Sequence, residues 1–197
     1  MRKLNVPYLS QINNVYHPWS ACNVTSIAMC LLYRGIVGDR SHQQLEDQIY
    51  HRSREIGANR FTPEGIKAIV ESYNRTNDLN LNGSLADIRK SIDEDAPVII
   101  HGWFTEPGHI IVIKGYDENE KMFIVHDPYG EWFPWYYDVN TVTNFKGKER
   151  KYSYRAIAAC CSSWNYYQGQ DYYDDRSFIP EAAKEMWVHS IRPTIKN

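Results

Sequence analysis

Apolar residues near the N-terminus recur with the spacing of an amphipathic helix. The pattern i, i+3, i+4, i+7, i+8 has the 3.6-residue period of an α-helix. It is formed by Val24, Ile27, Ala28, Leu31 and Leu32. We expect Ser20 to be the N-cap of this helix and Gly35 to end it. Small or soft residues occupy the other side, namely Cys22, Thr25, Ser26, Met29 and Cys30. The helix is therefore predicted to be covered on two sides.

Three further helices are predicted in the first half of the chain. One spans residues 41–52, and a second begins at residues 62–64, where Thr, Pro and Glu combine a cap, a proline at the first helical position and an acid in the first turn. A third, short helix begins at Ser84, with Asp87 three residues later. The residues expected to face inward are Leu45, Ile49, Ile66, Ile69, Val70, Tyr73, Leu85, Ile88 and Ile92. Residues 52–59 and 74–82 are expected to be polar connections.

After Pro97 the pattern changes to β-branched runs, which favour strands. Strands are expected at residues 98–100, 109–113, 122–125 and 186–191. The segment 117–120 is a short turn, so the strands on either side of it should form an antiparallel hairpin. The prediction is an α+β fold in one domain, 1–197, with a helical part over about 1–95 and a sheet part over about 96–197.

The remaining segments are less regular. Residues 3–10 are expected to be extended, and residues 11–19 to form a polar loop. The aromatic residues 132–137 predict a strand or a strand-like flap. Residues 153–161 could be a strand, but their Ala content and helical spacing favour a helix, and residues 164–176 are expected to be a long loop.

The hairpin brings a histidine and an aspartate close together. If Tyr116 faces Lys121, His109 lies opposite Pro128, one step from Asp127; with a loop one residue shorter, His109 faces Asp127 directly. A slip of one residue turns a side chain to the other face of a sheet. The sequence thus predicts that His109 and Asp127 are close, and leaves their orientation open.

Composition and charge exclude several classes of protein. The formal net charge of −2 offers no broad basic surface, so nucleic acid is not an expected partner. The sequence contains neither an apolar stretch long enough to span a membrane nor the apolar core of a secretory signal, so we expect no membrane insertion and synthesis in the cytoplasm. The four cysteines lack the spacing of a disulfide framework or a zinc site, and no cofactor or metal is expected.

Cys22 is a candidate nucleophile because it lies in the first turn of the predicted helix. Unpaired N–H groups and the positive end of the helix dipole favour a thiolate there, so its pKa can lie well below the usual value of ~8.5. The alternative is a buried structural cysteine, which is the commoner role of a lone cysteine.

The chain also contains the groups that such a nucleophile requires. His109 follows Gly108 at the start of a strand and can manage the proton of a thiol, and Asp127 can orient the imidazole. Gln11 and the backbone N–H of Cys22 are candidate donors to an oxyanion. A metal hydrolase built on His101, His109, His126 and Asp127 is disfavoured because no ligand pair has i, i+4 spacing.

Four segments in order, residues 6–11, 21–29, 108–117 and 125–130, resemble the C39-like branch of papain-fold cysteine peptidases. The resemblance implies a papain-like fold in which the Cys22 helix packs on an antiparallel sheet. It also implies that Cys22 is the nucleophile, His109 the base, Asp127 its orienter and Gln11 the oxyanion donor. Many family members have Cys-Gly-Pro where this chain has Cys22-Asn23-Val24, which puts the shape of the oxyanion pocket in question. Leader-peptide processing by a transporter-attached member is disfavoured, since the chain has no membrane segment and no P-loop.

Two functions follow from these residues. The first is a thiol hydrolase of peptide or related amide bonds, either a stand-alone protease or a peptidoglycan-cleaving lysin of phage origin with a role in host lysis. In the lysin, Trp19, Trp132 and Trp135 would bind substrate, and the aromatic sets at 132–137 and 164–173 would stack on sugar rings; the alternative for these aromatic residues is packing over the core. The second function is a catalytically silent papain-fold protein that binds an assembly partner, for example in a virion or a multisubunit complex.

Overall fold

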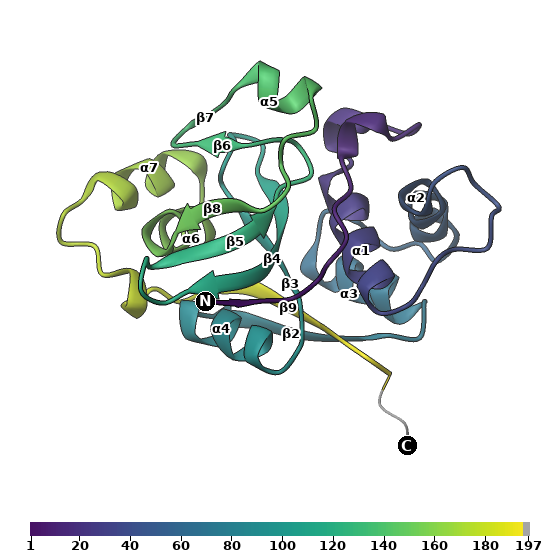
Figure 1. Cartoon of the computed structure of the whole chain (residues 1–197), viewed down its shortest axis with the longest axis horizontal. Helices are drawn as coiled ribbons and strands as arrows, with labels where there is room; N and C mark the ends of the chain where they lie inside the picture. Colours follow the sequence, from purple (N-terminus) through teal and green to yellow (C-terminus); the bar gives the residue numbers. More distant parts are fainter. Residues whose placement is uncertain (195–197) are drawn as a thin grey trace.

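The computed structural model describes residues 1–194, and its centre is an antiparallel β-sheet (Figure 1). Within these residues seven strands pair in the order β2-β9-β3-β4-β5-β8, and β1 adds to β4. The strands are β1 (Arg2–Lys3), β2 (Thr76–Gly83), β3 (Val98–Gly102), β4 (His109–Asp117), β5 (Met122–His126), β8 (Arg150–Ser153) and β9 (Met186–Arg192). A separate small hairpin joins β6 (Trp132–Phe133) to β7 (Tyr136–Tyr137), as the aromatic stretch predicts.

Helices cover both faces of the sheet. They are α1 (Cys22–Tyr33), α2 (Leu45–Glu55), α3 (Pro63–Glu71), α4 (Leu85–Asp93), α5 (Val139–Thr143), α6 (Tyr154–Cys161) and α7 (Tyr166–Asp174). Three short 3-10 turns are η1 (Gln11–Asn13), η2 (Pro18–Ser20) and η3 (Pro180–Ala182). Figure 1 shows α1, α2 and α3 together on one side of the sheet and α6 and α7 on the other.

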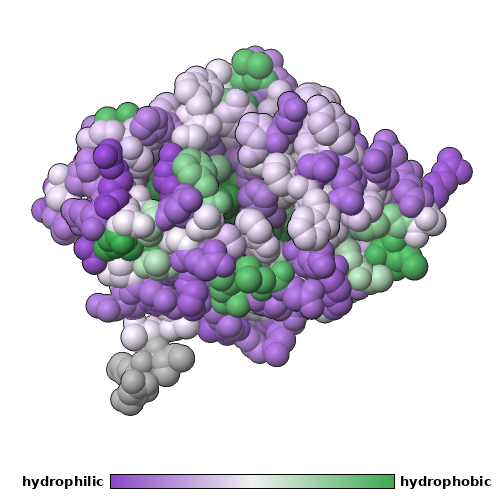
Figure 2. Space-filling model, turned by 180° about the vertical axis from the view of Figure 1, so that it is seen from behind, coloured by the Kyte–Doolittle hydropathy of each residue, from purple (hydrophilic) through white to green (hydrophobic). Residues whose placement is uncertain are grey.

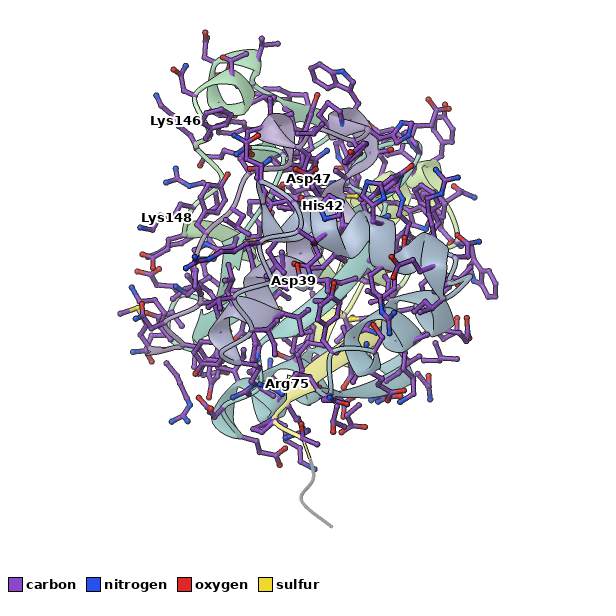
Figure 3. All side chains as sticks on the ribbon, turned by 90° about the vertical axis from the view of Figure 1, so that its right-hand side faces the viewer. Asp39, His42, Asp47, Arg75, Lys146 and Lys148 are labelled. Carbon is purple, nitrogen blue, oxygen red and sulfur yellow. The ribbon has the colours of Figure 1, made fainter. Side chains whose placement is uncertain are left out.

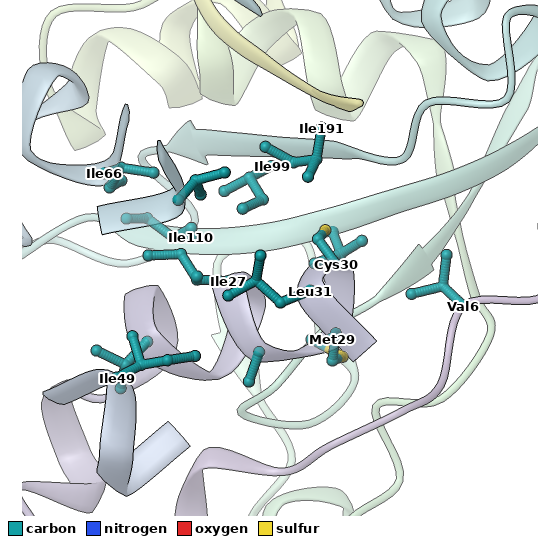
Figure 4. Packing of buried hydrophobic residues seen from close by; sticks show 14 of the residues in the cluster. Val6, Ile27, Met29, Cys30, Leu31, Ile49, Ile66, Ile99, Ile110 and Ile191 are labelled. Carbon is teal, nitrogen blue, oxygen red and sulfur yellow. The ribbon is translucent and has the colours of Figure 1, made fainter. Parts of the chain in front are cut away.

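The two faces of the sheet bury different residues because side chains alternate along a strand. Ile99, Ile110 and Ile191 face the first layer, where they pack with Ile27 and Leu31 of α1 (Figure 4). The opposite face of the sheet forms a second hydrophobic core with α4 and α6. Its strand residues include Val98, Ile100, Ile111, Ile113, Phe123, Val125 and Val188. The sheet thus fixes α1 on one side, and the predicted packing of this helix on an antiparallel sheet is confirmed.

Helix α1 is covered on both sides, as its sequence predicts, and every residue from Asn23 to Leu31 is buried. The predicted N-cap is wrong. Ser20 ends the preceding 3-10 turn, and Ala21 stands at the cap position without a side-chain bond. The Ser20 hydroxyl instead accepts a hydrogen bond from Arg60.

Two other helix starts are confirmed. Thr62 caps α3, with its side chain accepting a hydrogen bond from the Gly65 N–H, and Ser84 and Asp87 form both bonds of a capping box. Helix α2 begins later than predicted, at Leu45, and continues to Glu55 into a segment expected to be loop. Helix α6 is confirmed at 154–161, with Ser153 as its cap.

Two segments expected to be irregular are regular. Residues 76–83 form β2, an edge strand whose side chains are mostly in contact with water, so it lacks the alternation that identifies a half-buried strand. Residues 166–174 form α7, which starts at an Asn165 cap and packs on α6. The fold is α+β, as predicted, and the division into a helical first part and a sheet second part has exceptions, because β2 lies in the first part and α5, α6 and α7 lie in the second.

The central hairpin is antiparallel, as predicted, but in neither of the two expected registers. Asp117 pairs with Met122 and Tyr116 with Phe123; an irregularity between Ile113 and Gly115 then changes the register, so that Val112 pairs with His126. The extra residue belongs to β4. Asp127 follows directly after the last paired residue of β5.

The outer surface is largely polar. The face in Figure 2 is mostly hydrophilic, with hydrophobic residues in small separate groups. Figure 3 shows another side, where Asp39, His42, Arg75, Lys146 and Lys148 lie on the loops and edges of the fold. None of the helices in residues 1–194 is long and apolar enough to cross a membrane.

Candidate active site

Three elements bring Cys22, His109 and Asp127 together. Cys22 is the first residue of α1, His109 is the first residue of β4, and Asp127 follows β5. Helix α1 packs on β4, and the Ser26 hydroxyl donates a hydrogen bond of 3.3 Å to the Ile110 carbonyl. The start of the helix therefore lies beside the start of the strand.

His109 and Asp127 form a buried pair. The His109 Nε2 atom lies 2.8 Å from Asp127 Oδ1, and the two residues are 5% and 0% exposed. The hydrogen bond through Nε2 leaves Nδ1 as the ring nitrogen free to interact with Cys22. This arrangement is the one that a histidine needs to serve as a proton carrier with a fixed orientation.

Asp127 is itself held by three more donors. The Tyr129 N–H donates to Oδ1 at 3.0 Å, and the hydroxyls of Tyr137 and Tyr152 donate to Oδ2 at 2.7 and 2.8 Å. A buried carboxylate with all these bonds has little freedom to rotate. The two tyrosines were not among the predicted site residues. Their place in the site depends on the tertiary fold, and no motif marks them.

The electrostatics favour a charged pair at neutral pH. Burial opposes protonation of His109, but the adjacent Asp127 carboxylate outweighs it and raises the pKa of His109 to about 10. Burial also opposes ionisation of Cys22, but interaction with the His109 imidazole lowers the pKa of the Cys22 thiol below its usual value. Burial instead raises the thiol pKa of Cys30, Cys160 and Cys161. Cys22 thus differs from the other three cysteines in the direction that increases reactivity.

Gly108 is required by the backbone just before His109. Its φ angle is +83°, and a Cβ atom added there would lie 2.7 Å from His101 Nε2. A side chain at this position would be both strained and in collision. The Gly-His pair of the sequence is therefore explained by the way the chain turns into β4.

Gln11 reaches the site through two short turns. The loop expected at 11–19 contains η1 and η2, and the Gln11 N–H donates to the Pro128 carbonyl at 2.8 Å, which anchors this loop next to Asp127. The side-chain Nε2 donates to the Pro18 carbonyl at 2.8 Å and retains a second hydrogen. Gln11 lines the same cavity as Cys22. The backbone N–H of Cys22, at the first position of α1, has no partner within the helix.

Arg60 is a buried cation behind Cys22 that the sequence did not reveal. It is 9% exposed and donates to the Ser20 carbonyl, to the Ser20 hydroxyl at 3.1 Å and to Asn23 Oδ1 at 2.7 Å. Its guanidinium also lies 4.3 Å from the centre of the Phe61 ring. The ion pairs of residues 1–194 do not include Arg60. Its uncompensated charge contributes to the lowered pKa of Cys22.

Asn23, where this chain departs from Cys-Gly-Pro, is the partner of that cation. Its Oδ1 accepts from Arg60 and from the Val24 N–H at 2.8 Å, and the residue is fully buried. A guanidinium has only donors, so the oxygen of the amide must face it. The Asn23 side chain therefore links the start of α1 to Arg60.

A cavity of about 340 Å³ opens over Cys22 and His109. Trp19 lines it and is 73% exposed, so it is available to a ligand. Trp132 and Trp135 are not among the lining residues. Trp132 is 4% exposed and its Nε1 donates to the Phe104 carbonyl at 2.9 Å, while the Trp135 ring packs on it edge to face. These two tryptophans therefore pack against the second core, and their binding of substrate stays a prediction.

The histidines outside the pair have other surroundings. His126 is buried and bonds to the Val6 carbonyl and the Glu149 N–H, on the opposite side of β5 from the site. His101 lines the cavity beside His109. Within the described part of the chain, no three His, Cys, Asp or Glu side chains are grouped as metal ligands.

Comparisons with known proteins identify the family. A model of the "Peptidase_C39 like family" matches residues 3–161. A solved chain from Bacillus anthracis, assigned as a C39-like peptidase, has a similar fold, with a TM-score of 0.51 and 18% identity, and the match covers 98% of each chain. No curated protein matches. The order of motifs, the fold and the family match agree, and the chain belongs to the C39-like peptidase family.

Proposed function

We propose that this chain is a cysteine peptidase or related thiol hydrolase, which cleaves amide bonds through an acyl-enzyme on Cys22. The observation that carries the proposal is the bond between His109 and Asp127, in a site where the Cys22 pKa is lowered and the other thiol pKa values are raised. The membership of the C39-like family supports the same reaction class.

In the first half of the reaction, the Cys22 thiolate attacks the carbonyl carbon of the substrate, and the carbonyl π electrons move to oxygen. The Cys22 N–H and the second hydrogen of Gln11 Nε2 are the donors available to that oxygen. When the oxyanion collapses, the C–N bond breaks and protonated His109 gives its proton to the leaving amine. Asp127 keeps the imidazole oriented throughout.

In the second half, water attacks the thioester. Neutral His109 accepts a proton from the water as the oxygen attacks the carbonyl carbon, and the second oxyanion forms at the same place as the first. Collapse releases the carboxylic acid and restores the Cys22 thiolate beside protonated His109.

The substrate is a peptide or a peptidoglycan-like stem peptide, the latter in the version in which the protein is a phage lysin. The aromatic side chains of Trp19, Phe61 and Tyr129 line the cavity and would cover a bound chain. Both kinds of substrate present an amide carbonyl to Cys22.

Hydrolysis assays distinguish these versions. Purified protein is incubated with unstructured peptides and, separately, with purified peptidoglycan sacculi, and the products are identified by mass spectrometry. We expect amide cleavage of at least one substrate, lost in Cys22→Ala and in His109→Ala and kept in His42→Ala, which changes a half-buried loop histidine outside the site. If the wild type forms no acyl-enzyme and releases no product from either substrate, the silent binding protein is the better explanation.

A further inference from the structure

A second cavity adjoins the candidate active site. Its volume is about 270 Å³, and His101 lines both this cavity and the one at Cys22. Tryptophans from three separate segments form its walls: Trp103 after β3, Trp164 between α6 and α7, and Trp187 in β9. The two cavities therefore share His101 as a wall.

The shared wall carries no positive charge at neutral pH. The His101 ring lies 5.3 Å from the Trp103 ring, edge to face, and 5.2 Å from the Trp187 ring. Burial, together with the nearby charge of His109, lowers the pKa of His101 to about 4. His101 is therefore neutral under physiological conditions, and the lining residues include no lysine or arginine.

Glu185 is the single acidic residue of the lining. Its backbone is held at a φ of 65° and its N–H donates to Asn82 Oδ1 at 3.3 Å. Within residues 1–194 the carboxylate forms no ion pair with a lysine or arginine. Glu185 is an exposed residue, and its carboxylate is thus available to pair with a ligand at this cavity.

Several hydrogen-bond donors of the cavity are already used by the protein. Trp103 Nε1 donates to the Ser163 carbonyl at 2.9 Å, and the hydroxyls of Ser162 and Ser163 donate to main-chain carbonyls of α6 at 2.7 and 3.3 Å. A sugar ring presents hydroxyls that both donate and accept, whereas an ammonium or guanidinium group only donates. An acceptor carboxylate beside tryptophan rings is complementary to a cation.

We propose that the cavity between Trp103, Trp164, Trp187 and Glu185 is a subsite for a basic side chain of the substrate, such as lysine. The proposal rests on the proposed function, because the substrate is positioned by its scissile amide at Cys22. The methylene groups of the basic residue contact the tryptophans, and its charged end pairs with Glu185.

Binding to an inactive variant tests this subsite separately from hydrolysis. The protein is full-length Cys22→Ala, and the probes are alanine–glycine peptides of equal length, each with one lysine at a different position, paired with peptides that carry norleucine there. By calorimetry we expect one position at which lysine binds about tenfold more tightly than norleucine. In the background of Cys22→Ala, Glu185→Gln should reduce that ratio to near one. Glu55→Gln removes an exposed carboxylate from α2, which Figure 1 shows far from α7, and should leave the ratio unchanged.

Two results with these peptides would overturn the subsite: equal binding of lysine and norleucine peptides at every position, or a lysine preference that survives Glu185→Gln. A third would be binding of a chitin oligosaccharide that is abolished by Trp187→Ala and is not competed by lysine peptides. The proposed function is tested by other observations, namely the reactivity of Cys22 and the hydrolysis of peptides by the wild type. A wild type that hydrolyses peptides without a basic preference would contradict the subsite alone.

Discussion

At the scale of single residues, the least expected feature is the charge of Arg60. A buried guanidinium is costly unless an opposite charge compensates for it, yet the oxygens that Arg60 contacts are neutral. The thiolate of Cys22 provides such a charge, and each group stabilises the ionised form of the other. Arg60 is thus a positioning residue that acts on Cys22 through the first turn of α1.

Replacing this charge should change the ionisation of Cys22. We predict that Arg60→Gln raises the pH midpoint of Cys22 alkylation by about one unit, because a nearby cation no longer favours the thiolate. Arg60→Lys should recover part of the shift. The control is Arg34→Gln at the other end of α1, where the arginine is paired with Asp95. Rates of iodoacetamide labelling across pH measure the effect, and an unchanged midpoint in Arg60→Gln would refute this role.

The sequence predicted the three central residues but not the groups around them. Cys22, His109 and Asp127 each stand at a point that local patterns identify, at a helix start or a strand end. Arg60 and Tyr152 contact the site from separate segments whose local patterns carry no sign of it, and Tyr137 belongs to an aromatic segment for which the sequence predicts other roles. Trp132 shows the converse case, since an aromatic residue expected to bind substrate is buried in the core.

At the scale of elements, the turn into β4 determines where His109 lies. Gly108 and Gly35 share nearly the same φ, +83° and +81°, but a Cβ at Gly35 would meet no atom within 4 Å. Substitutions at these two glycines therefore separate the energetic cost of backbone strain from the cost of a steric collision. Gly108 is the position where both effects act next to a candidate catalytic side chain.

We predict that Gly35→Ala lowers the free energy of unfolding by about 1 kcal/mol, the cost of a positive φ in a residue with a side chain. Gly108→Ala should cost more, about 2–3 kcal/mol, because the new methyl group also displaces the His101 ring. Urea unfolding measures both variants. Equal costs would mean that the contact with His101 is irrelevant.

The elements that the sequence missed share one physical cause. Strand β2 is a polar edge strand, and α7 is a polar and aromatic helix, so neither shows the periodic apolar stripe from which an element is identified. The buried elements were predicted because α1 and α3 show such a stripe and β3, β4 and β9 contain apolar β-branched residues. The hairpin register depends on an irregularity between Ile113 and Gly115, which no local pattern indicates.

At the scale of the whole molecule, buried histidines set the response to acid. Burial lowers the pKa of His126 to about 4 and of His189 to about 3. In the unfolded chain both would titrate near 6.5. The unfolded state therefore takes up protons first as the pH falls below that value, and the folded state loses stability.

We predict that these two histidines do not affect the free energy of unfolding well above pH 6.5. Below that value the free energy of unfolding should fall as the pH decreases towards 4. His109 contributes little slope below about pH 6, where it is protonated in both states, and its own stabilising effect is lost as the pH rises from about 6.5 towards 10. Urea unfolding at several pH values between about 6 and 5, where His109 is protonated in both states, measures the slope. A stability that stays constant or increases as the pH falls over that interval would contradict the lowered pKa values of the two buried histidines.

The most direct test of the catalytic account is the alkylation rate of each cysteine. Wild-type protein and His109→Ala are labelled with iodoacetamide over a range of pH and mapped by mass spectrometry. We expect Cys22 to react fastest, with an onset below the usual thiol pKa, and we expect His109→Ala to slow Cys22 without affecting Cys30, Cys160 or Cys161. If Cys22 reacts as slowly as the buried cysteines, or at the same rate with and without His109, the account of Cys22 as an activated nucleophile is wrong.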